Sequence, residues 1–324
     1  MEAALYDREE GYYAKGPRIG EGGDFATSPS ISSIFAGVIA RRFRREAERG
    51  EGPVDFVEVG AGDGRFLGDF AAALLREDGD FAARVRLTAV EKSWAGHEAL
   101  AARPGLSGLR VLASAEELPP RSVNGWIFSN ELYDALPVAR VRGGMEGLEE
   151  LRVGAVDTGF GWTAAPAPED LRRHVASLGI ALEQGQIGEV SPEAAPLHRT
   201  LARALTRGFL VAFDYGHRAE ALYHPLARRR GTLAVHSRGR RGGDPLERPG
   251  EMDLTAHVNW DELIRAGQEE GLATLGVFRQ GRYLTESGLF DLVETEAEKW
   301  RAFRLVDPEG MGEELSVLVQ QRCV

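Results

Sequence analysis

Short apolar runs alternate with amphipathic helical stretches along most of this chain. The runs predict buried β-strands at residues 54–59, 85–91, 109–113 and 123–129. Behind the first run, apolar side chains recur at helical spacing, as at Phe66, Leu67, Phe70 and Leu74. A helix is also predicted at residues 32–48. This alternation is typical of an α/β fold with a parallel, doubly wound sheet.

The alternation breaks after Pro137 and returns later in the chain. Further elements are predicted as helices at 193–206, 257–270 and 286–303 and strands at 208–214, 272–279 and 314–322. The sheet should therefore hold about seven mostly parallel strands. We expect residues 1–50 to form a lid segment and a helix, residues 51–137 and 186–324 to form the core, and residues 138–185 and 216–256 to be insertions that form a smaller lobe.

Composition and charge narrow the class of protein. The chain has 324 residues, of which 43% are hydrophobic and 27% charged, as in ordinary globular proteins. The net charge of −11 argues against a nucleic-acid partner. The single cysteine, Cys323, excludes an intrachain disulfide, and no zinc or other metal constellation is present. Without a signal peptide or a membrane-length apolar run, we expect a cytoplasmic protein with no membrane span.

The segment from Val54 to Leu67 carries the most specific chemistry. Its strand ends near Glu58 and breaks into Gly60, Gly62 and Gly64 before a helix begins. This strand, glycine turn and helix bring a nucleotide-like ligand against bare backbone. Glu58 and Asp63 would repel the pyrophosphate of a dinucleotide but favour the cationic ammonium and sulfonium of S-adenosylmethionine (SAM). The turn therefore predicts a SAM site.

Two later segments extend this predicted site. Glu91 ends the second strand, where an acid suits hydrogen bonds to both ribose hydroxyls. Ala115 and Glu116 follow the third strand, where the adenine would lie. Taken singly, each acid is equally well explained as an exposed carboxylate at the end of a strand.

Six ordered motifs resemble the MidA-like family of SAM-dependent methyltransferases. They are Leu5-Tyr-Asp7 with Gly11-Tyr-Tyr13, Gly23-Asp-Phe25 with Thr27-Ser-Pro29, the stretch from Glu58 to Gly64, Ser129-Asn-Glu-Leu-Tyr-Asp-Ala-Leu-Pro137, Glu189-Val-Ser-Pro192 with Asp214-Tyr-Gly216, and Pro249-Gly250 with Asp253-Leu-Thr-Ala-His-Val258. The mitochondrial member of this family is a complex I assembly factor that methylates an arginine of another protein.

The resemblance implies a class I, Rossmann-like methyltransferase fold that uses SAM and releases S-adenosylhomocysteine. It places Asp24 and Thr27 over the SAM pocket as part of a lid. The chain departs from the family pattern where Ser30 and Gly37 replace glutamates, and where His236 and Gly239 replace an aromatic residue and a histidine. These departures affect the proposed acceptor side more than the SAM side.

The candidate catalytic residues follow the fourth strand. Its carboxyl end faces the ligand crevice in this class of sheet, which places Asn130, Glu131 and Asp134 there. A guanidinium stays protonated in water, and two carboxylates would hold its fork while Asn130 accepts a hydrogen bond. His257 is a candidate general base. Asn130 and Asp134 also suit a capping role, and His257 a structural one.

Three functions fit these residues. The first is methylation of arginine on a protein substrate, and the second is methylation of a small molecule on the same scaffold. The third is SAM binding without turnover by an assembly or scaffold protein. A protein substrate that presents arginine, and a possible homodimer, are the expected partners.

Overall fold

A twisted central sheet forms the body of the molecule. The computed structural model describes residues 1–16, 27–47, 52–106, 108–157, 159–237 and 240–323. The strands follow the order β14 (Ala273–Arg279), β15 (Leu315–Arg322), β9 (Leu205–His217), β4 (Val123–Asn130), β1 (Val54–Val59), β2 (Val85–Val90) and β3 (Arg110–Leu112). β15 is antiparallel to both neighbours, and the other pairs from β9 to β3 are parallel. The short β13 (Val258–Asn259) adds to β9.

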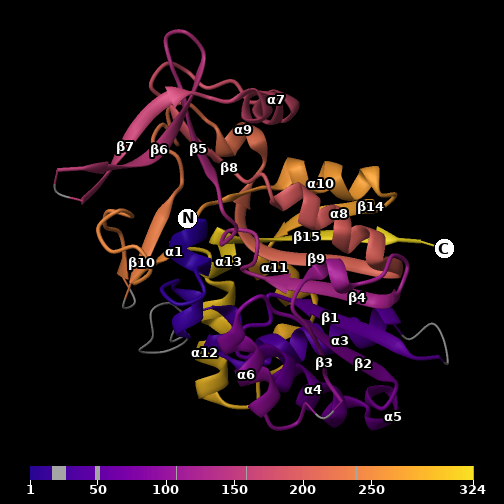
Figure 1. Cartoon of the computed structure of the whole chain (residues 1–324). Coiled ribbons are helices and arrows are strands. Elements are labelled where there is room, and N and C mark those ends of the chain that lie inside the picture. The colour runs from indigo at the N-terminus through magenta and orange to yellow at the C-terminus, as the bar shows by residue number, and fades with distance from the viewer. Residues whose placement is uncertain (17–26, 48–51, 107, 158, 238–239, 324) are drawn as a thin grey trace.

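The central strands lie inside the protein because helices cover both faces of the sheet (Figure 1). Every residue of β1 is buried, as expected for a parallel strand with helices on both sides. One face packs against α3 (Ser33–Ala47), α4 (Arg65–Glu77) and the C-terminal helices, and the other against α8 (Ala194–Ala204) and α10 (Trp260–Glu269). The mostly parallel α/β sheet predicted from the sequence is confirmed.

The predicted helix at 286–303 is wrong in its first half and confirmed in its second. The chain instead forms α11 (Gln280–Glu286), a 3₁₀ turn at Leu289–Leu292 and α12 (Glu296–Val306), followed by α13 (Met311–Glu314). Gly288 interrupts the helix with a φ of 91°, a conformation that glycine adopts without strain. α12 then restarts at Thr295, whose side chain forms a capping box with Glu298.

A four-stranded antiparallel sheet rises from the central body (Figure 1). Its order is β7 (Gly159–Pro166), β6 (Leu148–Val156), β5 (Ala139–Gly143) and β8 (Ile187–Val190). α7 (Glu169–Ser177) packs on one face through Leu171 and Val175. This sheet occupies the first predicted insertion but extends past residue 185, because β8 pairs with β5.

The second predicted insertion holds its own small sheet rather than irregular chain. β10 (Ala234–Ser237) pairs with β11 (Arg240–Arg241) and with β12 (Asp253–Thr255). The N-terminal α1 (Glu2–Tyr6) and the turn at Tyr13–Lys15 pack against this sheet, with Leu5 and Tyr12 meeting Val235 and Leu254 in one apolar cluster. The two insertions thus form two separate sheets.

The remaining short elements are α2 (Ser28–Ile31), α5 (Gly79–Ala82), α6 (Trp94–Ala102), the turn at Ala115–Glu117 and α9 (Ala219–Leu222).

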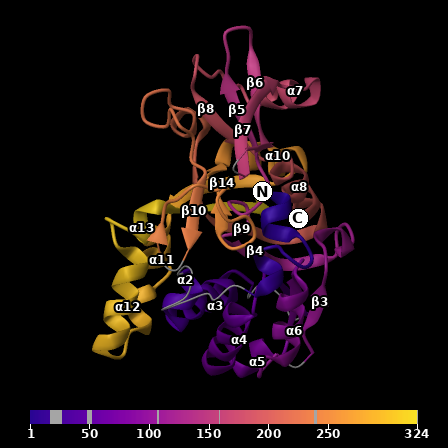
Figure 2. The same ribbon diagram turned by 60° about the vertical axis from the view of Figure 1, so that its left-hand side comes forward.

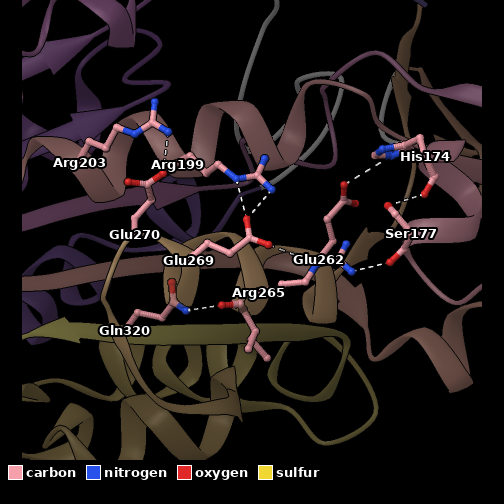
Figure 3. A network of polar contacts seen from close by, with 10 residues as sticks. His174, Ser177, Arg199, Arg203, Glu262, Arg265, Glu269, Glu270 and Gln320 are labelled. Carbon is pink, nitrogen blue, oxygen red and sulfur yellow. Dashed lines mark hydrogen bonds and ion pairs between the residues drawn. The ribbon is translucent and has the colours of Figure 1, made fainter. Parts of the chain in front are cut away.

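A polar network joins the four-stranded sheet to the core (Figure 3). His174 of α7 lies 3.4 Å from the carboxylate of Glu262 on α10, and Arg265 of α10 donates to the backbone carbonyl of Ser177. The network continues to α8, where Arg199 pairs with Glu269 at 2.7 Å. Burial raises the pKa of Glu262 to about 7 and lowers the pKa of His174.

The contact of Glu262 on α10 with His174 on α7 should make the free energy of unfolding depend on pH. A carboxyl group whose folded-state pKa is raised stabilises the fold at low pH and loses that contribution as pH rises through about 7. Glu262→Gln should therefore raise the free energy of unfolding by about 1–3 kcal/mol at pH 8 and change it little at pH 5. Urea unfolding of both proteins across this pH range measures the difference. An equal effect at both pH values would contradict the assignment.

Candidate functional site

A large cavity opens at the carboxyl ends of the central strands. Its volume is about 1970 Å³, and its walls come from the ends of β1, β2 and β4, the N-terminal segment and β12. Convergence at this edge follows from parallel strands, because their carboxyl ends all meet there. The cavity lining includes the predicted residues Thr27, Glu58, Gly60, Gly62, Glu91, Ala115, Glu116, Asn130, Glu131, Asp134 and His257.

The glycine turn forms one end of this cavity. Gly60, Gly62 and Gly64 have φ values of 76°, 53° and 72°, which side-chain-bearing residues rarely adopt. Gly64 lies behind the cavity wall at the start of α4, and a Cβ there would come within 2.6 Å of Leu100. A Cβ on Gly62 would meet no atom within 4 Å, so this backbone is open to a ligand.

Glu58 faces the cavity as a buried acid. Its residue is only 4% exposed, and its Oε2 atom has no hydrogen-bond partner among the described residues. Burial raises the pKa of Glu58 well above its ordinary value, and Glu91 and Asp63 raise it further. Asp63 itself is paired with Arg103 at 3.0 Å, so its charge is compensated within the protein. Glu58 is therefore the acid best placed to attract a cation.

Glu91 holds the turn in place. Its Oε2 accepts a hydrogen bond of 2.7 Å from the backbone N–H of Gly62, and its Oε1 accepts two from Ser93. The sequence alone did not predict this supporting role. Ala115 is buried beside the cavity, while Glu116 is exposed and bonds to Ser114. The predicted contacts of these residues with ribose and adenine stay predictions.

Glu131 and its neighbours form the other end of the cavity. Glu131 has a φ of 52°, and strain of this kind in a residue other than glycine costs roughly 1–3 kcal/mol and is often found at functional sites. Asn130 donates to Glu131 Oε1 at 3.0 Å, and the Asn130 Oδ1 atom is buried with no partner in the described part of the chain. Burial raises the pKa of Glu131 to about 8.

Two buried acids complete this end, beside the half-buried Glu131. Asp134 and Asp253 are 4% and 2% exposed. Burial, together with Asp214, Glu131 and Asp253, raises the pKa of Asp134 well above its ordinary value. Asp253 accepts a hydrogen bond of 3.0 Å from the hydroxyl of Tyr13. Asp253 and Tyr13 were not predicted as site residues from the sequence, although both lie in motifs that carry the family resemblance.

His257 lies in the turn between β12 and β13, before α10 rather than in it. Its ring stacks on Tyr215 with centroids 6.3 Å apart, and its backbone N–H donates to the Thr232 hydroxyl at 3.0 Å. Its predicted role as a general base stays a prediction. No group of three or more His, Cys, Asp or Glu side chains in the described part of the chain could hold a metal ion.

The predicted lid is only partly described. Asp24 lies outside the described residues, as does Gly239. Thr27 caps α2, and Ser30 completes a capping box by accepting from the Thr27 backbone N–H at 2.9 Å. Gly37 lies where a Cβ would come 3.3 Å from Leu292, and His236 bonds to Thr255. Ser30 therefore has a structural role in this chain, whereas His236 lines the cavity.

Residues 36–278 match the model of a family of S-adenosyl-L-methionine-dependent methyltransferases. The chain belongs to this family. A protein from Burkholderia thailandensis, solved with S-adenosylhomocysteine bound, superimposes with a TM-score of 0.86 and 28% identity over 99% of this chain and 86% of that one.

Curated relatives of this methyltransferase are also similar over most of its length. The mitochondrial protein arginine methyltransferase NDUFAF7 of Bos taurus is 26% identical over 89% of this chain and 69% of its own. The protein of the same name from Danio rerio is 25% identical over 97% of this chain and 80% of its own. These similarities confirm the MidA-like resemblance and the Rossmann-like fold expected from the sequence.

The residues of this methyltransferase fit SAM. Glu58 offers a buried carboxylate oxygen, which has no hydrogen-bond partner in the described ranges, to a cationic ammonium, and the glycine turn offers open backbone. Among the described residues, no helix has both the length and the apolar character needed to cross a bilayer.

Glu58→Gln should weaken SAM binding and change its pH dependence. In the free protein the raised pKa keeps part of Glu58 protonated, so affinity for a cation should rise with pH until Glu58 is ionised. Loss of a charged hydrogen bond worth about 1.5–3 kcal/mol predicts roughly 10- to 150-fold weaker binding. Calorimetric titration from pH 6 to 9, with NAD as a ligand control, measures this. Wild-type affinity in the variant would remove Glu58 from the site.

Proposed function

We propose that this enzyme transfers the methyl group of SAM to an arginine guanidinium on another protein. The observation that carries the proposal is the cluster of the half-buried Glu131 and the buried Asp134 and Asp253 in the same cavity as the glycine turn. The relatives named protein arginine methyltransferases support it. When bound, SAM supplies an electrophilic methyl carbon on a sulfonium.

A guanidinium matches this acid cluster in charge and shape. It remains protonated at neutral pH and presents its N–H donors as a planar fork. Buried carboxylates are costly without a cation, which is why the pKa values of Glu131 and Asp134 are raised. A bound guanidinium would return both groups to their charged forms, so that acceptor binding releases protons. Glu131 and Asp134 therefore hold the guanidinium between them, and we call this pair the clamp.

The remaining polar groups control orientation and the proton. The Oδ1 atom of Asn130 can accept one acceptor N–H, which leaves a single nitrogen directed at the methyl carbon. That nitrogen gains a methyl group and loses a proton, and the nearby carboxylates are available to receive it. Tyr6 and Tyr13 lie stacked with centroids 5.4 Å apart and line the same cavity, and the ammonium of Lys92 lies 4.4 Å from the centroid of the Tyr6 ring.

Glu131→Gln should abolish methyl transfer while leaving SAM affinity nearly unchanged. The amide keeps the shape of the side chain but removes the negative charge that holds the guanidinium. We expect the rate of methylation to fall at least 100-fold, measured as labelled methyl groups on arginine after incubation of labelled SAM with extract proteins. Wild-type kcat/KM should also rise with pH through about 8, where Glu131 ionises.

Controls separate this function from the alternatives. Equal SAM affinity in wild type and variant shows that the SAM-binding end of the cavity is intact. Label that appears only in small molecules would favour a small-molecule acceptor, and SAM binding without any labelled product would favour a scaffold role. Full activity of the variant on arginine would contradict the clamp.

A further inference from the structure

The hairpin of β6 and β7 has an exposed surface that the proposed chemistry does not use. β7 is the edge strand of the four-stranded sheet and pairs only with β6 in the described structure. Its sequence, Gly159-Phe-Gly-Trp-Thr-Ala-Ala-Pro166, carries no charged side chain. Phe160 and Trp162 on β7 are 53% and 38% exposed, and Val153 of β6, opposite Trp162, is 50% exposed.

An exposed edge strand without charged side chains is unusual in a protein that binds no other protein. Exposed edge strands are commonly protected by charge, proline or a covering segment, because their free N–H and C=O groups recruit other chains. Several charges of β5 and β6 are paired with each other, as in Arg152 with Glu150 at 2.6 Å and Arg142 with Glu149 at 2.7 Å. The edge therefore presents apolar side chains and a row of backbone groups that no strand of the described structure pairs.

The hairpin extends toward the cavity. β5 begins just after Leu136 and Pro137, which line the cavity, and Leu151 of β6 pairs with Arg140 near that start. Residues 152–156 of β6 and their partners on β7 therefore lie beyond β5 on the cavity side, by roughly 15 Å at about 3.3 Å per residue. Figures 1 and 2 agree, since both show the hairpin over the side that carries α1 and β10.

A chain of contacts also connects the hairpin to His257, which lines the cavity. The ring of Trp162 lies 4.8 Å from the guanidinium of Arg140, and Arg140 pairs with the buried Glu189 at 3.2 Å. Glu189 accepts a hydrogen bond of 2.6 Å from the backbone N–H of Thr232. The Thr232 hydroxyl in turn accepts from the backbone of His257. The base of the hairpin is thus fixed relative to the cavity wall.

We propose that the β6–β7 hairpin is the docking surface for the methyl-accepting protein. An extended segment of that protein pairs along β7 as a fifth strand, with its apolar side chains on Phe160 and Trp162. Its arginine then enters the cavity, where the buried acids complement its charge. This inference rests on the proposed function and adds how the substrate protein is recognised.

Phe160→Lys tests the docking surface, with Leu75→Lys as the matched control. Leu75 is a 67% exposed apolar residue on α4, outside the cavity lining. Extract from a strain that lacks this gene is incubated with labelled SAM and each protein, and labelled arginine in protein is measured. We expect Phe160→Lys to lower labelling at least tenfold, with SAM affinity and melting temperature unchanged, and Leu75→Lys to match wild type. Trp162→Lys should act in the same direction.

Each other outcome counts against the docking surface. Equal labelling by wild type and both hairpin variants would overturn it. So would a wild-type dimer in sedimentation that Phe160→Lys converts to a monomer of full activity, because the edge would then be an interface between copies of this chain. No labelling by wild type would remove the proposed function itself, and the docking surface with it.

Discussion

The hydrogen bonds of Asp214 fix the end of the cavity that contains Asn130, Glu131 and Asp134. This fully buried residue on β9 accepts from the backbone N–H groups of Leu132, Tyr133 and Tyr215. The chain after β4 is thereby tied to the neighbouring parallel strand, and the strained conformation of Glu131 is maintained. Burial raises the pKa of Asp214 to about 7, although these bonds oppose the shift. Asp214 itself does not line the cavity, so its influence on a ligand is indirect.

Burying several acids in one cavity is unfavourable for folding and useful for binding. An unpaired buried charge is costly, and the folded protein limits that cost by keeping some of these groups protonated. Their energy is recovered only when a cation enters. Glu58 at one end of the cavity and Glu131 at the other share this property, so under the proposed function both ends favour positive charge by the same physical effect.

The buried strands, and the edge of the sheet where the cavity lies, could be predicted from local patterns in the sequence. Strands buried on both faces appear as apolar runs, and the crevice rule placed Asn130, Glu131 and Asp134 at the correct edge. β7 escaped prediction because it is exposed on both faces and has no apolar–polar alternation. Asp253 and Tyr13 escaped because they meet across 240 positions of sequence, and no local pattern reports such a contact.

That long-range contact also bears on how the protein is made. Tyr13 is synthesised 240 residues before its partner Asp253, which emerges only after the strands from β1 to β9 have been translated. Loop-closure entropy disfavours the early formation of such contacts. A nascent chain that already holds the glycine turn and the strands next to it still lacks one wall of its cavity. The wall of the cavity that contains Asp253 can therefore form only after residue 253 has been translated.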